Sequence, residues 1–284
     1  MVSTGVLYIA IGAEYLREAK VSVESLRECM PDVSVALITD QSVDDERFDR
    51  VISERTLPDD YGSSTLWPDV SPFERTIFLD TDTYVYSDVS ELFEVLDESD
   101  LAAAIAPNQN TVEGVPNACV EYNTGVVSFR STERVNAFFD AWQHRYETWR
   151  AERGLSRNQP SFTKTLYESD LDVCPLPTRY NCKSHFPGYL TGEAKVIHGR
   201  RHSASLATVA EALNSTREKR VHRPRSYFST TSPIHIYEGL PWRYQLEKSM
   251  AHYSGLVSDG VSILRNEGVG SLYRSTRSYL RQDG

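Results

Sequence analysis

The sequence lacks long apolar runs, has few cysteines and carries less positive than negative charge, and each shortage excludes a class of protein. No apolar run approaches the roughly 20 residues of a membrane-spanning helix. The 4 cysteines form no C-x-x-C pair and no signal peptide is recognised, so we expect reduced thiols in a cytoplasmic protein. The 30 Lys and Arg against 40 Asp and Glu give a formal net charge of −10, which argues against a nucleic-acid-coating protein.

Charge is distributed unevenly along the 284 residues, which are enough for one large α/β domain with a substantial core. Acidic residues gather between Asp40 and Asp60. The stretch from Lys195 to Arg225 is strongly basic, with only Glu211 and Glu218 as acids. This basic stretch is either a solvated face or a region that meets phosphate.

Apolar strand-like runs alternate with helical periodicity and predict a βαβ sheet. Strands are expected at residues 6–11, 33–40, 75–80 and 126–129, with a further apolar run at 101–106. Helices are expected at about 14–30, 90–96, 133–152 and 160–169, and loops dominate residues 175–241. Near-continuous apolar strands are typical of parallel sheets, and ligands bind beyond the carboxyl ends of such strands. Gly12, Asp40 and Asp80 lie at these ends.

The end of the chain differs from the rest. Apolar residues recur there at helix-like spacing with arginines between them, although Gly268 and Gly270 interrupt the pattern. We therefore expect a domain over residues 1–240 and an amphipathic helical tail over residues 241–284. Such a tail either lies in a membrane surface, peripheral on the inner face, or docks on its own domain.

Asp80 and Asp82 carry the strongest chemical signal. They follow a buried strand, Thr76 to Leu79, and a tight turn would bring both carboxylates toward one hard cation. Mg²⁺ and Mn²⁺ prefer oxygen ligands and share their shell with substrate phosphates, where the metal neutralises a departing diphosphate. The alternative is an ordinary acidic turn.

Three further segments carry polar groups with either a structural or a chemical interpretation. Asn123-Thr124-Gly125 has two interpretations. It is a simple turn, or the Asn123 amide orients a sugar hydroxyl while Gly125 lets substrate approach the backbone. Asn158 also has two interpretations. It caps a helix that has Pro160 in its first turn, or Asn158 and Gln159 reach the sugar.

His198, in the third segment, closes a short apolar run. It is either a structural histidine or a third metal ligand, and a neutral imidazole suits Mn²⁺ better than Mg²⁺. Arg200 follows it closely and would hold a diphosphate, because its guanidinium fork matches phosphate oxygens.

Taken in chain order, these segments resemble the GT-A fold nucleotide-diphospho-sugar transferases, particularly the family-eight-like glycosyltransferases. The resemblance covers about residues 5–200. Its segments are Gly5–Ala10 with Tyr15, Ser71–Thr83, Glu121–Phe129, Asn158–Pro160 and Lys195–Arg200. It implies an α/β, Rossmann-like domain with a mixed, mostly parallel sheet flanked by helices.

The resemblance also implies a function and a set of site residues. The function is metal-dependent transfer of a hexose-type sugar from a nucleotide-diphosphate sugar to a hydroxyl of a carbohydrate, lipid-linked or protein acceptor. Metal ligands would be Asp80, Asp82 and His198, with Mn²⁺ or Mg²⁺ bound. Donor contacts would come from Ala10, Tyr15, Thr39, Asp40, Asp80, Thr81, Asn123, Gly125 and Arg200. The groups at the reacting sugar would be Asn123, Asn158 and Gln159.

The sequence departs from the family pattern at two places. Residues 61–69 lack the basic residue that many members carry before the metal strand. The family's H-x-x-G-x-x-K-P-W tail is echoed by His235 to Trp242 without its lysine, so His235 rivals His198 as a metal ligand.

Two other functions fit parts of the pattern. One is a non-catalytic nucleotide- or sugar-binding module of the same fold. The other is a phosphatase of the haloacid dehalogenase type, which also uses D-x-D, but Tyr84 occupies its fifth position and the motif lies far from the N-terminus. Stereochemistry stays open: retention needs no strong base, whereas inversion needs a carboxylate that the sequence does not identify.

Overall fold

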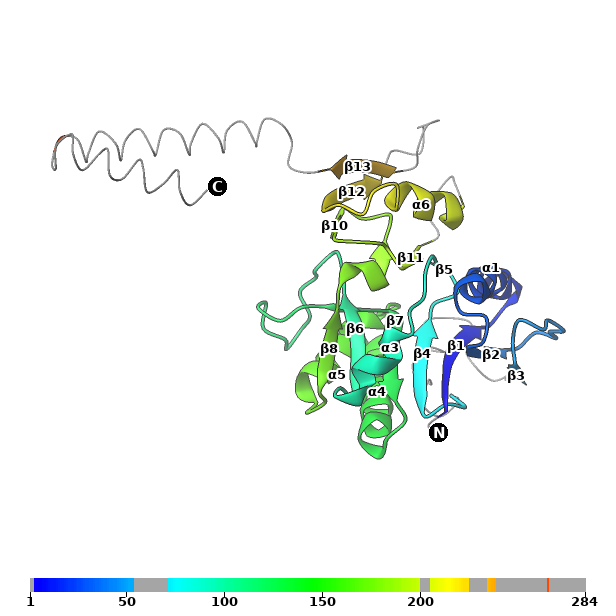
Figure 1. Ribbon diagram of the computed structural model, residues 1–284. Coiled ribbons are helices and arrows are strands. Elements are labelled where there is room, and N and C mark those ends of the chain that lie inside the picture. The colour runs from blue at the N-terminus through cyan, green and yellow to red at the C-terminus, as the bar shows by residue number, and fades with distance from the viewer. Residues whose placement is uncertain (1–2, 54–70, 200–204, 225–233, 239–264, 266–284) are drawn as a thin grey trace. The chain divides into compact units, whose positions relative to one another are not determined.

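The computed structural model describes residues 3–53, 71–199, 205–224, 234–238 and 265 (Figure 1). The chain divides into two compact units, Met1–Ile236 and Tyr237–Gly284. The elements below lie in the first unit, except that its last strand runs into the second. The predicted tail lies outside the described residues apart from Arg265, and the predicted boundary at residue 240 stays a prediction.

A seven-stranded sheet forms the centre of the first unit, in the order β3-β2-β1-β4-β7-β6-β8. Neighbouring strands are parallel, except that β7 runs antiparallel to both β4 and β6. This confirms the mixed, mostly parallel sheet. The strands are β1 (Thr4–Ala10), β2 (Ser34–Thr39), β3 (Arg50–Ser53), β4 (Arg75–Leu79), β6 (Leu101–Ile105), β7 (Tyr122–Arg130) and β8 (Val173–Leu176).

Helices cover both faces of the sheet, because successive strand residues point to opposite sides. On one face, Val6 and Tyr8 of β1 pack in a cluster with residues of α1 (Ala13–Cys29) and α3 (Glu91–Glu94), which continues into η2 (Val95–Asp97). On the other face, Leu7 and Ile9 pack with α4 (Glu133–Arg153) and α5 (Gln159–Glu168). All these helices were predicted from periodicity. No helix within the described ranges has the length and apolarity needed to cross a membrane.

The region expected to be rich in loops contains more structure than its composition indicates. Its strands take part in two small three-stranded sheets, β5-β11-β9, in which β5 comes from the segment after Asp82, and β10-β12-β13. Their strands are β5 (Thr83–Val85), β9 (Cys182–Lys183), β10 (Gly188–Leu190), β11 (Val196–His198), β12 (Arg220–Pro224) and β13 (Ile234–Glu238). The turn η3 (Thr178–Tyr180) and helix α6 (Leu206–Leu213) complete the region. These strands are too short to show a period, so the sequence pattern does not reveal them.

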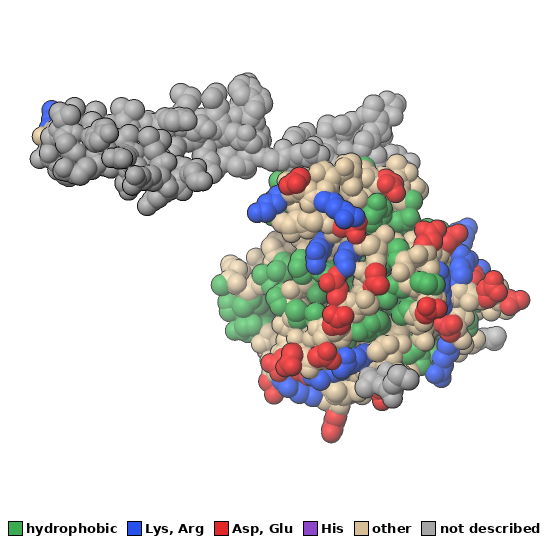
Figure 2. All heavy atoms as spheres, viewed as in Figure 1, with side chains coloured by type: hydrophobic (Ala, Val, Ile, Leu, Met, Phe, Trp, Pro, Cys, Tyr) green, Lys and Arg blue, Asp and Glu red, His purple; other side chains and the backbone are tan. Residues whose placement is uncertain are grey.

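Three cations of the basic stretch make bonds within the protein. The Arg220 side chain is 1% exposed and donates to the carbonyl oxygens of Gly192 at 2.7 Å and Leu213 at 2.8 Å. Lys195 pairs with Glu91, and Arg217 pairs with Glu193 at 3.0 Å. On the face shown in Figure 2, basic and acidic side chains lie side by side. Arg200, Arg201 and Arg225 lie outside the described residues.

The four cysteines are free thiols that differ sharply in environment. Cys119 is exposed, whereas Cys182 is fully buried and burial raises its thiol pKa to about 12. Since the thiolate is the reactive form, we expect a thiol reagent at pH 8 to label Cys119 quickly and Cys182 only after unfolding. Mass spectrometry of timed samples measures this. An unchanged fast phase in Cys119→Ser would contradict the assignment.

Candidate active site

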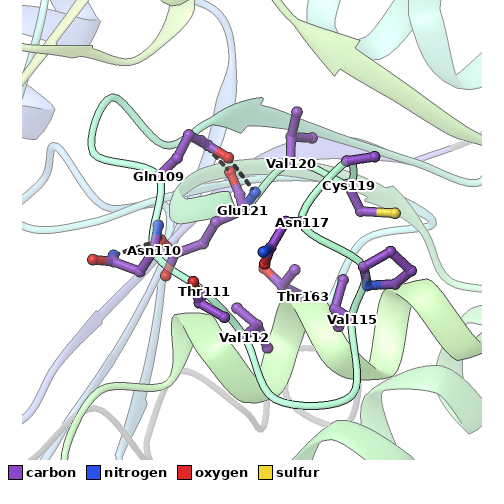
Figure 3. Close-up of a pocket in the computed structure, with 12 residues that line it drawn as sticks. Gln109, Asn110, Thr111, Val112, Val115, Asn117, Cys119, Val120, Glu121 and Thr163 are labelled. Carbon is purple, nitrogen blue, oxygen red and sulfur yellow. Dashed lines mark hydrogen bonds between the residues drawn. The ribbon is translucent and has the colours of Figure 1, made fainter.

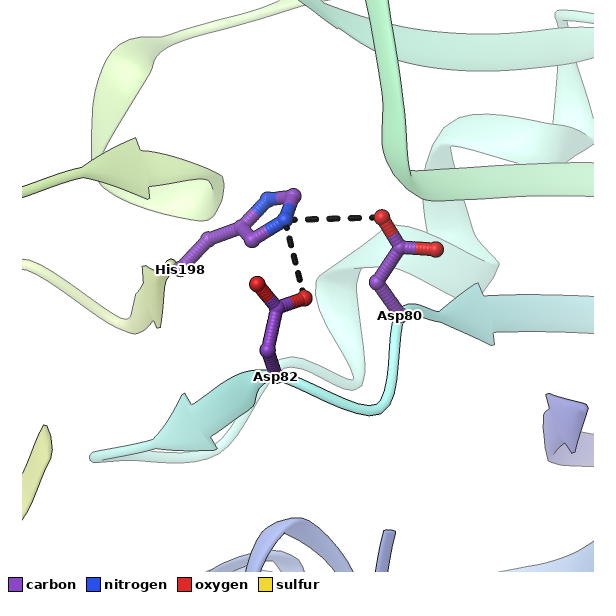
Figure 4. Close-up of side chains that lie close together, drawn as sticks. All are labelled: Asp80, Asp82 and His198. Atoms are coloured by element: carbon purple, nitrogen blue, oxygen red, sulfur yellow. Dashed lines mark ion pairs between the residues drawn. The ribbon is translucent and has the colours of Figure 1, made fainter. Parts of the chain in front are cut away.

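Asp80, Asp82 and His198 meet at one point beyond the carboxyl edge of the central sheet (Figure 4). The ligand atoms of all three lie within 4.8 Å of one another. His198 Nε2 is 3.4 Å from Asp80 Oδ2 and 3.3 Å from Asp82 Oδ1. The histidine side chain is 2% exposed, whereas the Asp80 side chain is 34% exposed, so the cluster opens to solvent on the aspartate side.

Backbone pairing brings these residues together from distant parts of the sequence. β5 begins directly after Asp82 and runs antiparallel to β11, with Thr83 opposite His198. The Gly199 N–H donates to the Asp82 carbonyl at 3.0 Å, and the Asp80 N–H donates to the Gly125 carbonyl at 2.9 Å. The tight turn predicted between the two aspartates is therefore fixed from both sides by backbone hydrogen bonds.

Helix α1 supports the same turn through hydroxyl groups. Thr81 Oγ1 donates to Glu18 Oε2 at 2.9 Å. Thr83 Oγ1 donates to the Asp80 carbonyl at 2.8 Å and lies 2.7 Å from the buried Ser22 hydroxyl. Thr81 was predicted to contact the nucleotide sugar. In the structure it is 5% exposed, and its hydroxyl ties the turn between the two aspartates to α1.

The charges around His198 suit a divalent cation. Burial and the ammonium of Lys183 lower the pKa of His198, but the carboxylates of Asp82 and Asp80 outweigh them and the net shift is upward. Lys183 Nζ lies 3.1 Å from His198 Nε2. Two carboxylates and an imidazole around one point form a donor set that Mn²⁺ or Mg²⁺ accepts, so the residues present fit a divalent metal.

Gly125 lies directly beneath this cluster. A Cβ atom built on Gly125 would lie 2.8 Å from Asp80 Oδ2 and would also collide with the His198 ring. The glycine was expected to let substrate approach the backbone, but in the structure the approaching groups are the candidate metal ligands themselves. The register between β6 and β7 shifts here, as at a β-bulge, and leaves residues 124–126 without partners in β6.

We expect Gly125→Ala to keep the fold and to weaken Mn²⁺ binding at least about tenfold, because displacing ligands by an ångström is costly. The added methyl group would push the His198 ring and the Asp80 carboxylate away from each other. Free Mn²⁺ measured by electron paramagnetic resonance gives the affinity. Ser128→Ala, a buried change on the same strand, is the control. Equal Mn²⁺ affinity in both variants would contradict the prediction.

The predicted sugar-contacting residues form a hydrogen-bonded group next to the cluster. Asn123 Nδ2 donates to Gln159 Oε1 at 3.1 Å, and Thr124 Oγ1 donates to Asn158 Oδ1 at 3.2 Å. Gln159 begins α5, as predicted, and Pro160 lies in the first turn. Asn158 occupies the N-cap position, but its side chain makes no capping hydrogen bond, so the capping interpretation does not explain it.

The predicted nucleotide contacts lie at the ends of neighbouring parallel strands. Ala10 ends β1 and pairs with Thr39 at the end of β2, while β4 leads into Asp80 on the other side of β1. Asp40 is exposed, and the Gly12 N–H donates to its carboxylate at 2.8 Å, which lowers the Asp40 pKa. Tyr15, near the start of α1, is half-buried. These positions therefore share the edge of the sheet that carries the metal-ligand candidates.

Two of the predicted site residues have no described side chain, and three neighbours of the site were not predicted from the sequence. Arg200 lies outside the described residues, and His235 is described only as part of β13, whereas His198 lies beside the aspartates. The three neighbours make hydrogen bonds with residues of the site, and no motif marks any of them. They are Glu18, Asn181 and Lys183.

A hollow of about 330 Å³ lies in the loop that joins β6 to β7 (Figure 3). Thr163 contributes from α5, one helical turn after Gln159, and accepts a hydrogen bond from the Tyr122 N–H at 3.1 Å. The volume matches the lower end of small-molecule sites. The lining combines amides and apolar side chains: Gln109, Asn110, Val112, Val115, Asn117 and Cys119 among others.

Part of the chain is similar to one known protein family. Residues 75–205 match the family model of the nucleotide-diphospho-sugar transferases. The predicted resemblance to the nucleotide-diphospho-sugar transferases is confirmed. The matched segment contains Asp80, Asp82, Asn123, Gln159 and His198. A comparison with curated protein sequences gives no match.

Solved glycosyltransferases share the fold. The galactosyltransferase LgtC, solved with donor and acceptor sugar analogues, has a TM-score of 0.51 at 13% identity, over 74% of this chain and 94% of that one. The bifunctional glycosyltransferase WbbM has a TM-score of 0.50 at 14% identity, over 70% and 46%. GlyE of Streptococcus pneumoniae has a TM-score of 0.49 at 20% identity, over 64% of this chain and 48% of that one. The chain thus spans about half the length of GlyE. The GT-A fold is confirmed.

Proposed function

We propose that this chain transfers a hexose-type sugar from a nucleotide-diphosphate sugar to an acceptor hydroxyl and that the reaction depends on Mn²⁺ or Mg²⁺. The observation that carries the proposal is the meeting of Asp80, Asp82 and His198 at the carboxyl edge of the sheet. This edge is where ligands bind in open α/β sheets. The family match adds the nucleotide-diphospho-sugar donor class.

The metal ligands and the nucleotide contacts would bind different parts of the nucleotide sugar. Asp80, Asp82 and His198 would hold the cation, and the bound metal would supply positive charge to the two phosphates of the leaving group. Ala10, Tyr15, Thr39 and Asp40 would contact the base and ribose, because they share the same edge of the sheet. Thr81 would fix the turn between the aspartates, and Arg200 would contribute a further cation toward the diphosphate.

Asn123, Asn158 and Gln159 would position the sugar. Their amide groups are fixed by hydrogen bonds to one another and to Thr124, so they reach the reacting sugar already oriented. Gln159 is the least buried of the three, since Asn123 and Asn158 are each 3% exposed. We therefore assign the direct contact with the sugar to Gln159, and a supporting contact to the two asparagines.

The hollow beside α5 is our candidate for the acceptor. It is lined by Thr163, which lies on the same helix face as Gln159, and by amide side chains that suit a polyhydroxylated ligand. Cys119 lines it and is exposed. An acceptor bound there is therefore expected to slow thiol labelling of Cys119. Peripheral contact of the tail with a membrane surface stays a prediction, because the tail lies outside the described residues.

A donor panel tests the proposal. The chain is incubated with hexoses linked to each of the common nucleoside diphosphates, and release of free diphosphate is measured with Mn²⁺, with Mg²⁺ and with EDTA. We expect release from one donor or a few, abolished by EDTA and accelerated by the correct acceptor. Binding of a nucleotide sugar without release or transfer would favour a non-catalytic module. Release of inorganic phosphate from a phosphate ester instead would favour a phosphatase.

A further inference from the structure

Asn181 is a buried amide next to the metal-ligand histidine. It follows η3 directly and precedes β9, and it is 3% exposed. β9 runs parallel to β11, with Cys182 opposite Ile197 and Lys183 opposite His198, so Asn181 comes directly before the strand that pairs with β11. Asn181 Oδ1 lies 2.7 Å from His198 Nδ1, and Asn181 Nδ2 lies 2.7 Å from Asn123 Oδ1.

We propose that Asn181 is a positioning residue that holds His198 with a proton on Nδ1 and the Nε2 lone pair directed at the metal. This inference rests on the proposed metal site at Asp80, Asp82 and His198. It adds the cause of the histidine's orientation and links that orientation to the sugar-contacting amides.

A backbone group fixes the direction of the hydrogen bonds. The Gly125 N–H is an obligate donor, and it lies 3.0 Å from Asn123 Oδ1. That bond identifies the oxygen of Asn123, so the Asn181 atom that meets this oxygen must be the donating nitrogen. The other end of Asn181 is then its oxygen, which can only accept. His198 Nδ1 must therefore carry a proton.

Lys183 supports the same assignment from the other side of the ring. Its ammonium group is also an obligate donor and lies 3.1 Å from His198 Nε2. A lone pair on Nε2 can accept from that donor. Nε2 is also the atom that lies closest to the two aspartates, at 3.4 Å and 3.3 Å. The lone pair therefore points to the place where Asp80 and Asp82 would hold the cation.

The same chain of amides reaches the sugar end of the site. Asn123 uses its oxygen for Gly125 and Asn181, and its nitrogen donates to Gln159 Oε1 at 3.1 Å. His198, Asn181, Asn123 and Gln159 thus form one directional series, in which each amide has a single allowed orientation. Loss of Asn181 would leave both the His198 ring and the Asn123 oxygen short of a partner.

Three variants separate positioning from a general loss of stability. Asn181→Leu has a similar volume and removes both hydrogen bonds. Asn181→Asp keeps an oxygen for His198 Nδ1–H but turns an acceptor toward Asn123, so it should rescue the histidine and not the link to Gln159. Asn214→Leu is the control: the Asn214 side chain bonds the Ala194 N–H at 2.8 Å and the Ala194 carbonyl at 3.1 Å, receives a longer bond from Arg220 at 3.4 Å, and bonds none of the site residues.

The first measurement is the ring tautomer in the full-length, metal-free protein. Protein labelled with ¹⁵N-histidine is measured in alkaline buffer by two-bond ¹H–¹⁵N correlation spectra. The His198 signals are those that disappear in His198→Gln. We expect Nδ1 to resonate as a protonated nitrogen and Nε2 as an unprotonated one in the wild type, in Asn181→Asp and in Asn214→Leu. Asn181→Leu should show a mixture. The opposite tautomer in the wild type would overturn the proposal.

The second measurement is Mn²⁺ affinity by electron paramagnetic resonance. Loss of an outer-shell partner of a ligating histidine typically costs about 10- to 100-fold, so Asn181→Leu should weaken binding by that factor. Asn181→Asp and Asn214→Leu should stay within about threefold of the wild type, well under that factor. Equal affinity and an equal tautomer in Asn181→Leu and the wild type would overturn the proposal. A wild type that binds no Mn²⁺ but shows the expected tautomer would refute the proposed metal site and leave the role of Asn181 standing.

Discussion

Replacing Asp82 with asparagine is expected to lower metal-dependent release of nucleoside diphosphate by about 1,000-fold, equivalent to about 4 kcal/mol of transition-state stabilisation. The side chain is 13% exposed and its carboxylate lies 3.3 Å from His198 Nε2, so the change removes one negative charge from the centre of the cluster. An amide binds a divalent cation far less well than a carboxylate. Initial rates at saturating Mn²⁺, with the donor that the panel selects, measure the loss.

The control for this variant is Asp88→Asn, which lies shortly after β5 on the same segment. Asp88 accepts a hydrogen bond from the Ser90 N–H at 2.6 Å and takes no part in the metal cluster. It should keep nearly full activity. Asp82→Asn that retains more than about a tenth of the rate, a change of under 1.4 kcal/mol, would show that Asp82 is not a metal ligand.

Replacing Trp142 with alanine is expected to destabilise the domain by about 3–5 kcal/mol, the usual cost of removing a fully buried aromatic side chain. Trp142 is 0% exposed and its ring packs at 4.9 Å from Phe162 and 5.9 Å from Phe139. Its Nε1–H also donates to Ser161 Oγ at 3.1 Å. Because Ser161 lies in the first turn of α5, the loss should loosen the helix start that carries Gln159.

Urea denaturation followed by circular dichroism gives the free energy of unfolding. Tyr167→Ala on α5 is the control, because Tyr167 is 49% exposed and surface changes typically stay within about 0.5 kcal/mol. Trp142→Phe should lie between the two, since it keeps most of the ring volume and loses the indole hydrogen bond. A loss below about 1 kcal/mol for Trp142→Ala would mean that the cavity is refilled by the neighbouring phenylalanines.

The sequence predicts most of the sheet because buried parallel strands are long, continuous apolar runs. β1, β2 and β4 show this pattern, and the pattern alone is enough to place Ala10, Thr39 and Asp80 at strand ends on one edge. The D-x-D pair is equally visible, since its two acids come directly after such a strand. At these positions the local sequence pattern and the rule that ligands bind beyond the carboxyl ends of parallel strands give the same answer.

The rest of the site depends on contacts that leave no local pattern. β11 is three residues long, so nothing in its sequence predicts that His198 pairs opposite Thr83. Asn181 is one polar residue in a stretch expected to be loop, and its importance comes from two neighbours far along the chain. Gly125 stands out in the sequence, but its real constraint is the His198 ring above it, which the sequence cannot reveal. The basic stretch shows the same limit at one position: Arg220 looks like a surface cation in the sequence and is buried.

The central claim is that one divalent cation joins Asp80, Asp82 and His198 to the phosphates of a nucleotide sugar. Anomalous diffraction from crystals grown with Mn²⁺ and the nucleoside diphosphate of the selected donor tests it most directly. We predict a single manganese peak in contact with His198 Nε2 and with at least one of the two carboxylates, and with both phosphates of the nucleotide. A nucleotide bound at the ends of β1 and β2 with no manganese beside His198, or manganese bound elsewhere on the chain, would contradict the account.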